Sequence, residues 1–137
     1  MGPAITGIAH VELCVTDLDT SVDWYCKLLG AQDVFRGADE TEHITACAIF
    51  EPRTHMVLAF TQHLPGDGGT FSPRRPGLDH LAFAVADVAT LEAWATHLDT
   101  LGIPHSRIHE DANRATVITL QDPDQIALEL YVRRPRP

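Results

Sequence analysis

The sequence contains no long apolar run, and it has few basic residues and few cysteines. No segment approaches the about 20 consecutive apolar residues that span a bilayer, so we expect no membrane partner. The 10 Lys and Arg residues against 19 Asp and Glu residues give a formal net charge of −9. Because such an excess of negative charge repels phosphate backbones and anionic lipids, we expect no nucleic-acid partner either.

Cysteine usage and the amino terminus predict a cytoplasmic protein. The three cysteines are an odd number without CxxC spacing, which predicts neither a disulfide framework nor a zinc knuckle. Residues 1–5 show no basic cluster followed by an apolar run, the pattern of a secretory signal. Hydrophobic residues make up 45% of the 137 positions and charged residues 21%, so the chain can bury a core and fold.

The chain repeats itself at an offset of 70 residues. The stretch Gly7–Asp17 aligns with Gly77–Asp87, and Met56–Phe60 aligns with Ile126–Leu130 near the end of each copy. A repeat of this length predicts two copies of one supersecondary unit. We interpret residues 1–137 as a single domain with modules at about 6–63 and 77–133 and a Gly- and Pro-rich linker at 64–76.

The hydropathy pattern predicts the order βαβββ in each module. The aliphatic residues Val11, Leu13 and Val15 alternate with His10, Glu12 and Cys14. A period of two residues is typical of a strand with two different faces. Further strands are expected at residues 32–36, 44–50 and 56–61, and at residues 106–109, 115–120 and 126–132. The expected helices run from an N-cap to a left-handed glycine, Thr20 to Gly30 and Thr90 to Gly102. The sequence therefore predicts an α+β fold of two tandem βαβββ modules that form a cup-shaped mixed sheet.

One face of the predicted sheet carries histidine and carboxylate. The aliphatic face of each first strand must lie under the helix, so the opposite face looks into a concavity. His10 and His80 occupy the same repeat position on that face, and Glu129 lies on the strand expected beside that of His80. Two imidazoles and one carboxylate on one side of a cation form a facial triad with open positions for water, substrate or dioxygen.

A metal ion would explain a glutamate on the inner face. A buried ionised carboxylate without a basic partner is strongly unfavourable, and a divalent ion removes this penalty while it binds neutral imidazoles. We therefore predict one divalent metal ion (Fe, Mn, Ni, Zn or Mg) held by His10, His80 and Glu129. The alternative is that both histidines are core residues bonded to the backbone, with Glu129 protonated or in contact with solvent.

Several motifs resemble those of the vicinal oxygen chelate superfamily, over about residues 6–132. The motifs are Gly7-Ile-Ala-His10, Asp17-Leu-Asp-Thr-Ser21 with Trp24-Tyr25 and Leu29-Gly30, Gly77-Leu-Asp-His80, and Asp122-Pro-Asp124 with Leu128-Glu129. This superfamily includes glyoxalases, extradiol dioxygenases, fosfomycin-resistance thiol transferases and bleomycin-resistance proteins. The resemblance implies a glyoxalase-like fold and places His10, His80 and Glu129 on the family's metal-ligand positions.

One position departs from the lyases of this superfamily. Enzymes of the glyoxalase I type take a fourth ligand, Glu or Gln, from the first-module strand equivalent to that of Glu129, and the repeat register places Ala59 there. The resemblance therefore favours a three-ligand site. Glu12 shares the inner face with His10 and is either a candidate general base or a rim residue in water. Cys14 on the same face is expected to be a buried, inert thiol.

These features predict a metal-dependent enzyme that chelates a small oxygenated substrate. Fe(II) would support dioxygenase chemistry, and the other ions glyoxalase- or isomerase-like chemistry. The alternative is a protein of the bleomycin-resistance type, which confers antibiotic resistance by sequestering a small molecule in the cup without a working metal site. A homodimer is expected in both cases, because a second copy would cover open sheet edges. The modules could pair within one chain or across two.

Overall fold

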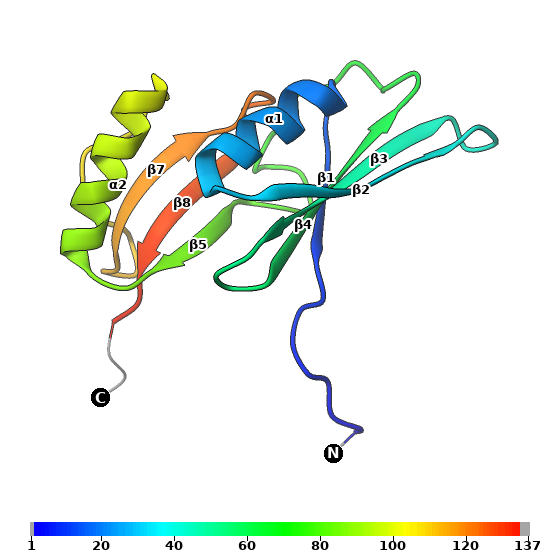
Figure 1. Cartoon of the computed structure of the whole chain (residues 1–137). Coiled ribbons are helices and arrows are strands. Elements are labelled where there is room, and N and C mark those ends of the chain that lie inside the picture. The colour runs from blue at the N-terminus through cyan, green and yellow to red at the C-terminus, as the bar shows by residue number, and fades with distance from the viewer. Residues whose placement is uncertain (1, 135–137) are drawn as a thin grey trace. The chain divides into compact units, whose positions relative to one another are not determined.

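The computed structural model describes residues 2–134 and divides the chain into two compact units, Met1–Gly68 and Gly69–Pro137. Figure 1 colours unit 1 from blue to green and unit 2 from green to red. The described part of each unit contains four strands and one helix. The division falls within the segment 64–76, which the sequence marked as a linker.

Unit 1 follows the order βαβββ along the chain. Its elements are β1 (Val11–Cys14), α1 (Leu18–Leu29), β2 (Gln32–Asp39), β3 (Ile44–Glu51) and β4 (Met56–His63). The strands form one sheet in the order β1-β4-β3-β2. β1 and β4 are parallel, whereas the other two pairs are antiparallel. The first and last strands of the unit are therefore neighbours.

Unit 2 has the same topology. Its elements are β5 (Leu81–Val85), α2 (Val88–Leu101), β6 (His109–Glu110), β7 (Thr116–Gln121) and β8 (Ala127–Val132). The sheet order is β5-β8-β7-β6, again with its first and last strands parallel. Two four-stranded mixed sheets, each with one helix, confirm the predicted α+β fold of two βαβββ modules.

Both helices begin at an aspartate rather than at the predicted threonine. The Asp17 side chain accepts a hydrogen bond from the backbone N–H of Thr20, and Asp87 accepts one from Thr90. The threonines were predicted wrongly as N-caps, because the carboxylate three residues earlier captures a free N–H group of the first turn. The helices end, as predicted, at glycines in the left-handed conformation, Gly30 at φ 65° and Gly102 at φ 67°.

The apolar face of each sheet packs under the helix of its own unit. In unit 1, Leu13 and Phe60 are buried, and the ring of Tyr25 on α1 lies 4.8 Å from that of Phe60 between centroids. In unit 2, Leu128 and Leu130 of β8 are buried, and Figure 1 shows α2 beside β7 and β8. Because side chains alternate along a strand, residues between these positions project from the opposite face.

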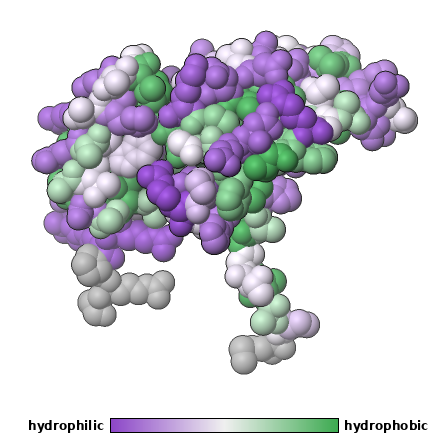
Figure 2. Space-filling model, in the orientation of Figure 1, coloured by the Kyte–Doolittle hydropathy of each residue, from purple (hydrophilic) through white to green (hydrophobic). Residues whose placement is uncertain are grey.

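The surface carries both polar and apolar residues. In Figure 2 a segment with apolar (green) residues extends from unit 1 ahead of β1, where Ile5 and Ile8 are exposed. These two side chains are therefore not part of the unit 1 core. No helix in residues 2–134 has both the length and the apolar character needed to cross a membrane.

Candidate metal centre

The two histidines occupy equivalent places at the start of the first strand of each unit. His10 immediately precedes β1, and His80 immediately precedes β5. Gly7 and Gly77 lie three residues earlier, each with a φ of 140°, a backbone conformation that residues with a Cβ atom rarely adopt. The same turn of the backbone therefore leads each histidine onto its sheet.

In unit 2, His80 and Glu129 lie close together. β8 pairs with β5 so that Glu129 is opposite Ala82, two residues beyond His80. His80 Nε2 lies 3.5 Å from Glu129 Oε2, and the Glu129 side chain is 16% exposed. Glu129 Oε2 is buried and has no hydrogen-bond partner among residues 2–134. The carboxylate oxygen nearest the imidazole is thus unsatisfied.

Asp79 orients the ring of His80. Its Oδ1 lies 2.7 Å from His80 Nδ1, so the Nδ1–H group donates to the carboxylate and Nε2 faces Glu129. The hydrogen bond to Asp79 raises the pKa of His80, and the charge of Glu129 acts in the same direction. Sequence reasoning missed Asp79, although it stands beside His80 in the motif and has only Ala9 as its counterpart in unit 1.

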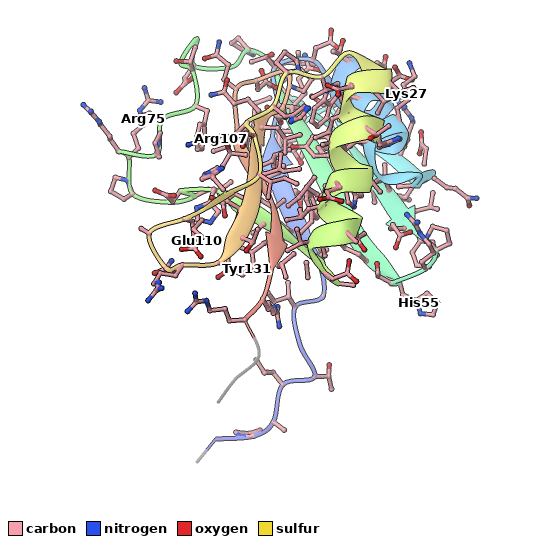
Figure 3. The ribbon with its side chains drawn as sticks, turned by 90° about the vertical axis from the view of Figure 1, so that its left-hand side faces the viewer. Lys27, His55, Arg75, Arg107, Glu110 and Tyr131 are labelled. Carbon is pink, nitrogen blue, oxygen red and sulfur yellow. The ribbon has the colours of Figure 1, made fainter. Side chains whose placement is uncertain are left out.

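In unit 1, His10 lies close to Glu12. His10 Nε2 is 3.7 Å from Glu12 Oε2, and the hydroxyl of Thr61 on β4 donates a hydrogen bond to Glu12 Oε1. The Glu12 side chain is partly exposed. Sequence reasoning missed Thr61, whose position in unit 2 is taken by Tyr131, labelled on β8 in Figure 3. The alternation of β4, with Phe60 buried in the core, could have placed Thr61 on the face of Glu12.

The structure groups the predicted site residues into two pairs. His80 and Glu129 meet in unit 2, and His10 and Glu12 meet in unit 1. Within the described part of the chain, no three or more His, Cys, Asp or Glu side chains gather into a group able to hold a metal ion. Each unit thus supplies one imidazole and one carboxylate. Cys14, expected to be buried, is exposed, because it lies on the face that its helix leaves uncovered.

The separation within each pair suits two ligands of one ion. The distances of 3.5 and 3.7 Å exceed the about 2.7–3.2 Å of a hydrogen bond. Two donors at about 2.1 Å from a divalent ion lie about 3.0 Å apart at a right angle and about 3.4 Å apart at the tetrahedral angle. Imidazole and carboxylate are together the donors that Fe(II), Mn(II) and Zn(II) accept. The residues present therefore fit a divalent ion.

A cavity of about 600 Å³ opens beside Glu129 in unit 2. Its lining includes the polar side chains of Ser106, Thr119 and Gln121, and none of its described lining residues is Lys or Arg. The volume lies in the range of about 300–1,000 Å³ that small-molecule sites occupy. A small uncharged molecule would thus find hydroxyl and amide partners next to the carboxylate.

Proteins of known sequence and structure resemble the chain over nearly its whole length. Catechol-2,3-dioxygenase of Bacillus subtilis (strain 168) is 29% identical over 133 residues, which are 96% of this chain and 43% of that protein. The chain therefore spans less than half of that relative. The crystal structure of a glyoxylase/bleomycin resistance protein/dioxygenase domain from Frankia sp. EAN1pec is 28% identical, with a TM-score of 0.84, and the match covers 98% of this chain and 96% of that chain.

A more distant structure shares the fold. FosX, a fosfomycin resistance protein from Listeria monocytogenes crystallised with Mn(II) and sulfate, is 16% identical with a TM-score of 0.69. That match covers 96% of this chain and 95% of FosX. The sequence model of a whole superfamily matches residues 7–130. The chain therefore belongs to the Glyoxalase/Bleomycin resistance protein/Dioxygenase superfamily.

Proposed function

We propose that the protein is a metal-dependent enzyme that uses one divalent ion, held by His10, His80 and Glu129, to bind a small oxygenated substrate. The observation that carries this proposal concerns Glu129 Oε2. This buried oxygen has no hydrogen-bond partner in the described residues and lies 3.5 Å from His80 Nε2. A buried carboxylate oxygen without a partner is unfavourable unless a cation binds it. The Mn(II) in the FosX structure supports a divalent ion as that cation.

Neighbouring groups prepare His80 and Glu129 for this role. The carboxylate of Asp79 accepts a hydrogen bond from the Nδ1–H of His80, which leaves the Nε2 lone pair directed towards Glu129. When bound, a divalent ion supplies Lewis-acid chemistry to the oxygens of a chelated substrate. The general-base role of Glu12 remains a prediction from the sequence.

The cavity beside Glu129 supports a small oxygenated substrate. Ser106, Thr119 and Gln121 offer hydrogen bonds to hydroxyl or carbonyl groups, and the described lining contains no Lys or Arg for a phosphate. We therefore favour a substrate that is uncharged or that chelates the ion through its oxygen atoms. Dioxygenase chemistry is favoured by the 29% identity to a catechol dioxygenase, and glyoxalase- or isomerase-like chemistry is the alternative for ions other than iron.

Metal analysis of protein purified without chelator tests the proposal. We expect about one equivalent of a divalent metal per site, because three ligands and a substrate complete one coordination sphere. The metal should be lost in His80→Ala and kept in the matched control His63→Ala, whose exposed side chain lies at the end of β4. A metal-free wild type that binds an antibiotic equally well with chelator present would support sequestration instead and refute the enzyme.

We further propose a homodimer in the cytoplasm. Each sheet of the described chain ends in a strand with one unpaired edge, and a second copy would cover such edges. Mass measurement in solution at micromolar concentration tests the assembly. A particle with the 15.0 kDa mass of one chain would refute the dimer.

A further inference from the structure

One pair of opposite residues differs in polarity between the two units. In unit 2, Thr119 of β7 is paired with Glu129 of β8. In unit 1, the residue equivalent to Glu129 is Ala59, and it is paired with Ala48 of β3. Paired residues of an antiparallel ladder point to the same face, with their Cβ atoms about 4.5–5.5 Å apart. The inner face of unit 2 therefore places a hydroxyl group beside the carboxylate, at a level where unit 1 has two methyl groups.

Ser106 fixes the backbone of Thr119. The strand β6 contains only two residues, so it does not extend along β7 as far as Thr119. Ser106 takes that place, because its backbone N–H donates to the C=O of Thr119 and its hydroxyl oxygen accepts the N–H of Thr119, both at 2.9 Å. The Ser106 hydroxyl donates in turn to the C=O of Arg107 at 2.8 Å. Both backbone hydrogen-bonding groups of Thr119 are thus satisfied, and the hydroxyl hydrogen of Ser106 is engaged within the chain.

A histidine holds the segment that carries Ser106. His105 Nδ1 lies 2.7 Å from the C=O oxygen of Ser106, and His105 Nε2 lies 3.1 Å from Asp99 Oδ1 on α2. The His105 side chain is only 15% exposed. The segment is therefore attached to both β7 and α2, so the neighbour that holds Thr119 is itself fixed.

The hydroxyl of Thr119 is a hydrogen-bond donor for a ligand in the cavity of unit 2. Thr119 is half-buried, and it lines this cavity together with Glu129 and Ser106. Glu129 Oε2 has no hydrogen-bond partner among residues 2–134, so Thr119 does not donate to that oxygen. Ser106 can accept a hydrogen bond from a ligand but does not donate one, because its hydrogen is bonded to Arg107. Thr119 therefore supplies the hydroxyl donor beside the carboxylate.

We propose that Thr119 determines the substrate specificity of this cavity by donating its hydroxyl hydrogen to an oxygen of the substrate bound beside Glu129. Ser106 is a positioning residue that acts through its hydrogen bond to Thr119. This inference rests on the proposed function and narrows the substrate class to molecules with an acceptor oxygen (phenol, carbonyl or carboxylate) within hydrogen-bond reach of β7. An apolar group at that place would leave the hydroxyl without a partner, which is unfavourable in a half-buried site.

Binding of catechol, a small molecule with two adjacent oxygens, tests the role of Thr119. The full chain is titrated by calorimetry, both with Mn(II) bound and after chelator treatment. Thr119→Val keeps nearly the shape of the side chain but lacks the hydroxyl, so it should bind catechol about five- to tenfold more weakly, the loss expected for one hydrogen bond. Thr119→Ser keeps the hydroxyl and should stay within about twofold of the wild type.

The matched control is Thr116→Val on the same strand. Thr116 is three residues from Thr119, so its side chain projects from the opposite face of β7, and it is not among the described residues that line the cavity. This variant should bind catechol as the wild type does. The Mn(II) content should be the same in all these variants, because Thr119 is not a ligand of the proposed ion.

A double variant tests the positioning role of Ser106. Ser106→Ala alone should weaken catechol binding about threefold, because it frees the backbone N–H of Thr119. In the Thr119→Val background the same substitution should cause no further loss, because Ser106 acts through the Thr119 hydroxyl. Equal losses in both backgrounds, in proteins whose circular dichroism is unchanged, would overturn this positioning role.

The outcomes separate the role of Thr119 from the proposed function. If the wild type binds Mn(II) and catechol and Thr119→Val binds catechol equally well, the inference fails and the proposed metal site is unaffected. If the wild type binds no Mn(II) but binds catechol, and Thr119→Val weakens that binding, the enzyme is refuted and Thr119 is a specificity residue of a sequestration protein. A wild type that binds no catechol in either state would overturn the inference.

Discussion

Glu51, at the end of β3, is a buried carboxylate whose replacement should have a pH-dependent effect on stability. Its side chain is 6% exposed. Oε2 accepts hydrogen bonds from the hydroxyl and the backbone N–H of Thr54, at 2.6 and 2.8 Å. Oε1 accepts them from Nε and the backbone N–H of Arg53, at 2.7 and 3.3 Å. The hydrogen bonds from Thr54 and Arg53 lower the pKa of Glu51 to about 2.

The variant Glu51→Gln keeps the size of the side chain but replaces one acceptor oxygen by a donor. About two hydrogen bonds to a charged group are then lost, each worth about 1.5–3 kcal/mol. Because the Arg53 side chain is 75% exposed, its contribution is screened by solvent. We expect the free energy of unfolding to fall by about 2–3 kcal/mol at neutral pH.

The difference between wild type and variant should shrink in acid. Because the pKa of Glu51 is lower in the folded than in the unfolded chain, the carboxylate stabilises the fold above its usual value of 4.5. That contribution is lost as the pH falls from 4.5 through about 2. Urea unfolding of both proteins, followed by tryptophan fluorescence from neutral pH down to about pH 3, measures the difference directly.

A matched control separates this effect from general charge. Glu40→Gln removes a carboxylate from an exposed position after β2 and should leave the unfolding free energy within about 0.5 kcal/mol of the wild type. The reasoning is refuted if Glu51→Gln and wild type differ by the same amount at every pH, or if they do not differ at neutral pH.

Three further predictions concern the site, a helix cap and the thiols. Asp79→Asn should weaken Mn(II) binding about tenfold, because it removes the carboxylate that orients His80. The circular dichroism spectrum should not change. An unchanged Mn(II) affinity in calorimetry would contradict this role of Asp79. Asp87→Ala should lower the urea concentration at the unfolding midpoint, and an unchanged midpoint would contradict the role of Asp87 as N-cap. In the folded protein a thiol reagent should modify exposed Cys14, whereas Cys47, buried and with its pKa raised to about 12 by burial and by Asp33, should react only after unfolding. Equal rates for the two thiols would contradict that assignment.

The internal repeat made the topology of each unit predictable. The alternation of apolar residues at Val11–Val15 recurs 70 residues later. A strand predicted in one unit was therefore also predicted at the equivalent position of the other unit. The helix N-caps were missed because threonine and aspartate are both good caps, and spacing alone does not choose between Thr20 and Asp17. Hydrogen bonding in the folded chain decided in favour of the carboxylate.

The sequence allowed us to predict which site residues lie on neighbouring strands, but not the hydrogen bonds between their side chains. Repeat register and alternation indicated that His80 and Glu129 occupy adjacent strands, and the structure gives their distance. The hydrogen bonds of Asp79 and Thr61 depend on side-chain rotamers, which period-two patterning does not specify.

In each unit the first and last strands are parallel neighbours, so the side chains that these two strands bring together meet only when the sheet is complete. Glu12 and Thr61 are 49 residues apart along the chain, and so are His80 and Glu129. Such contacts close large loops and form only when the last strand has joined the sheet. A partly folded unit 2 would present the imidazole without its carboxylate. An ion that binds only the finished sheets would shift the folding equilibrium towards the native state, so resistance to heat or urea would rise with the concentration of free ion.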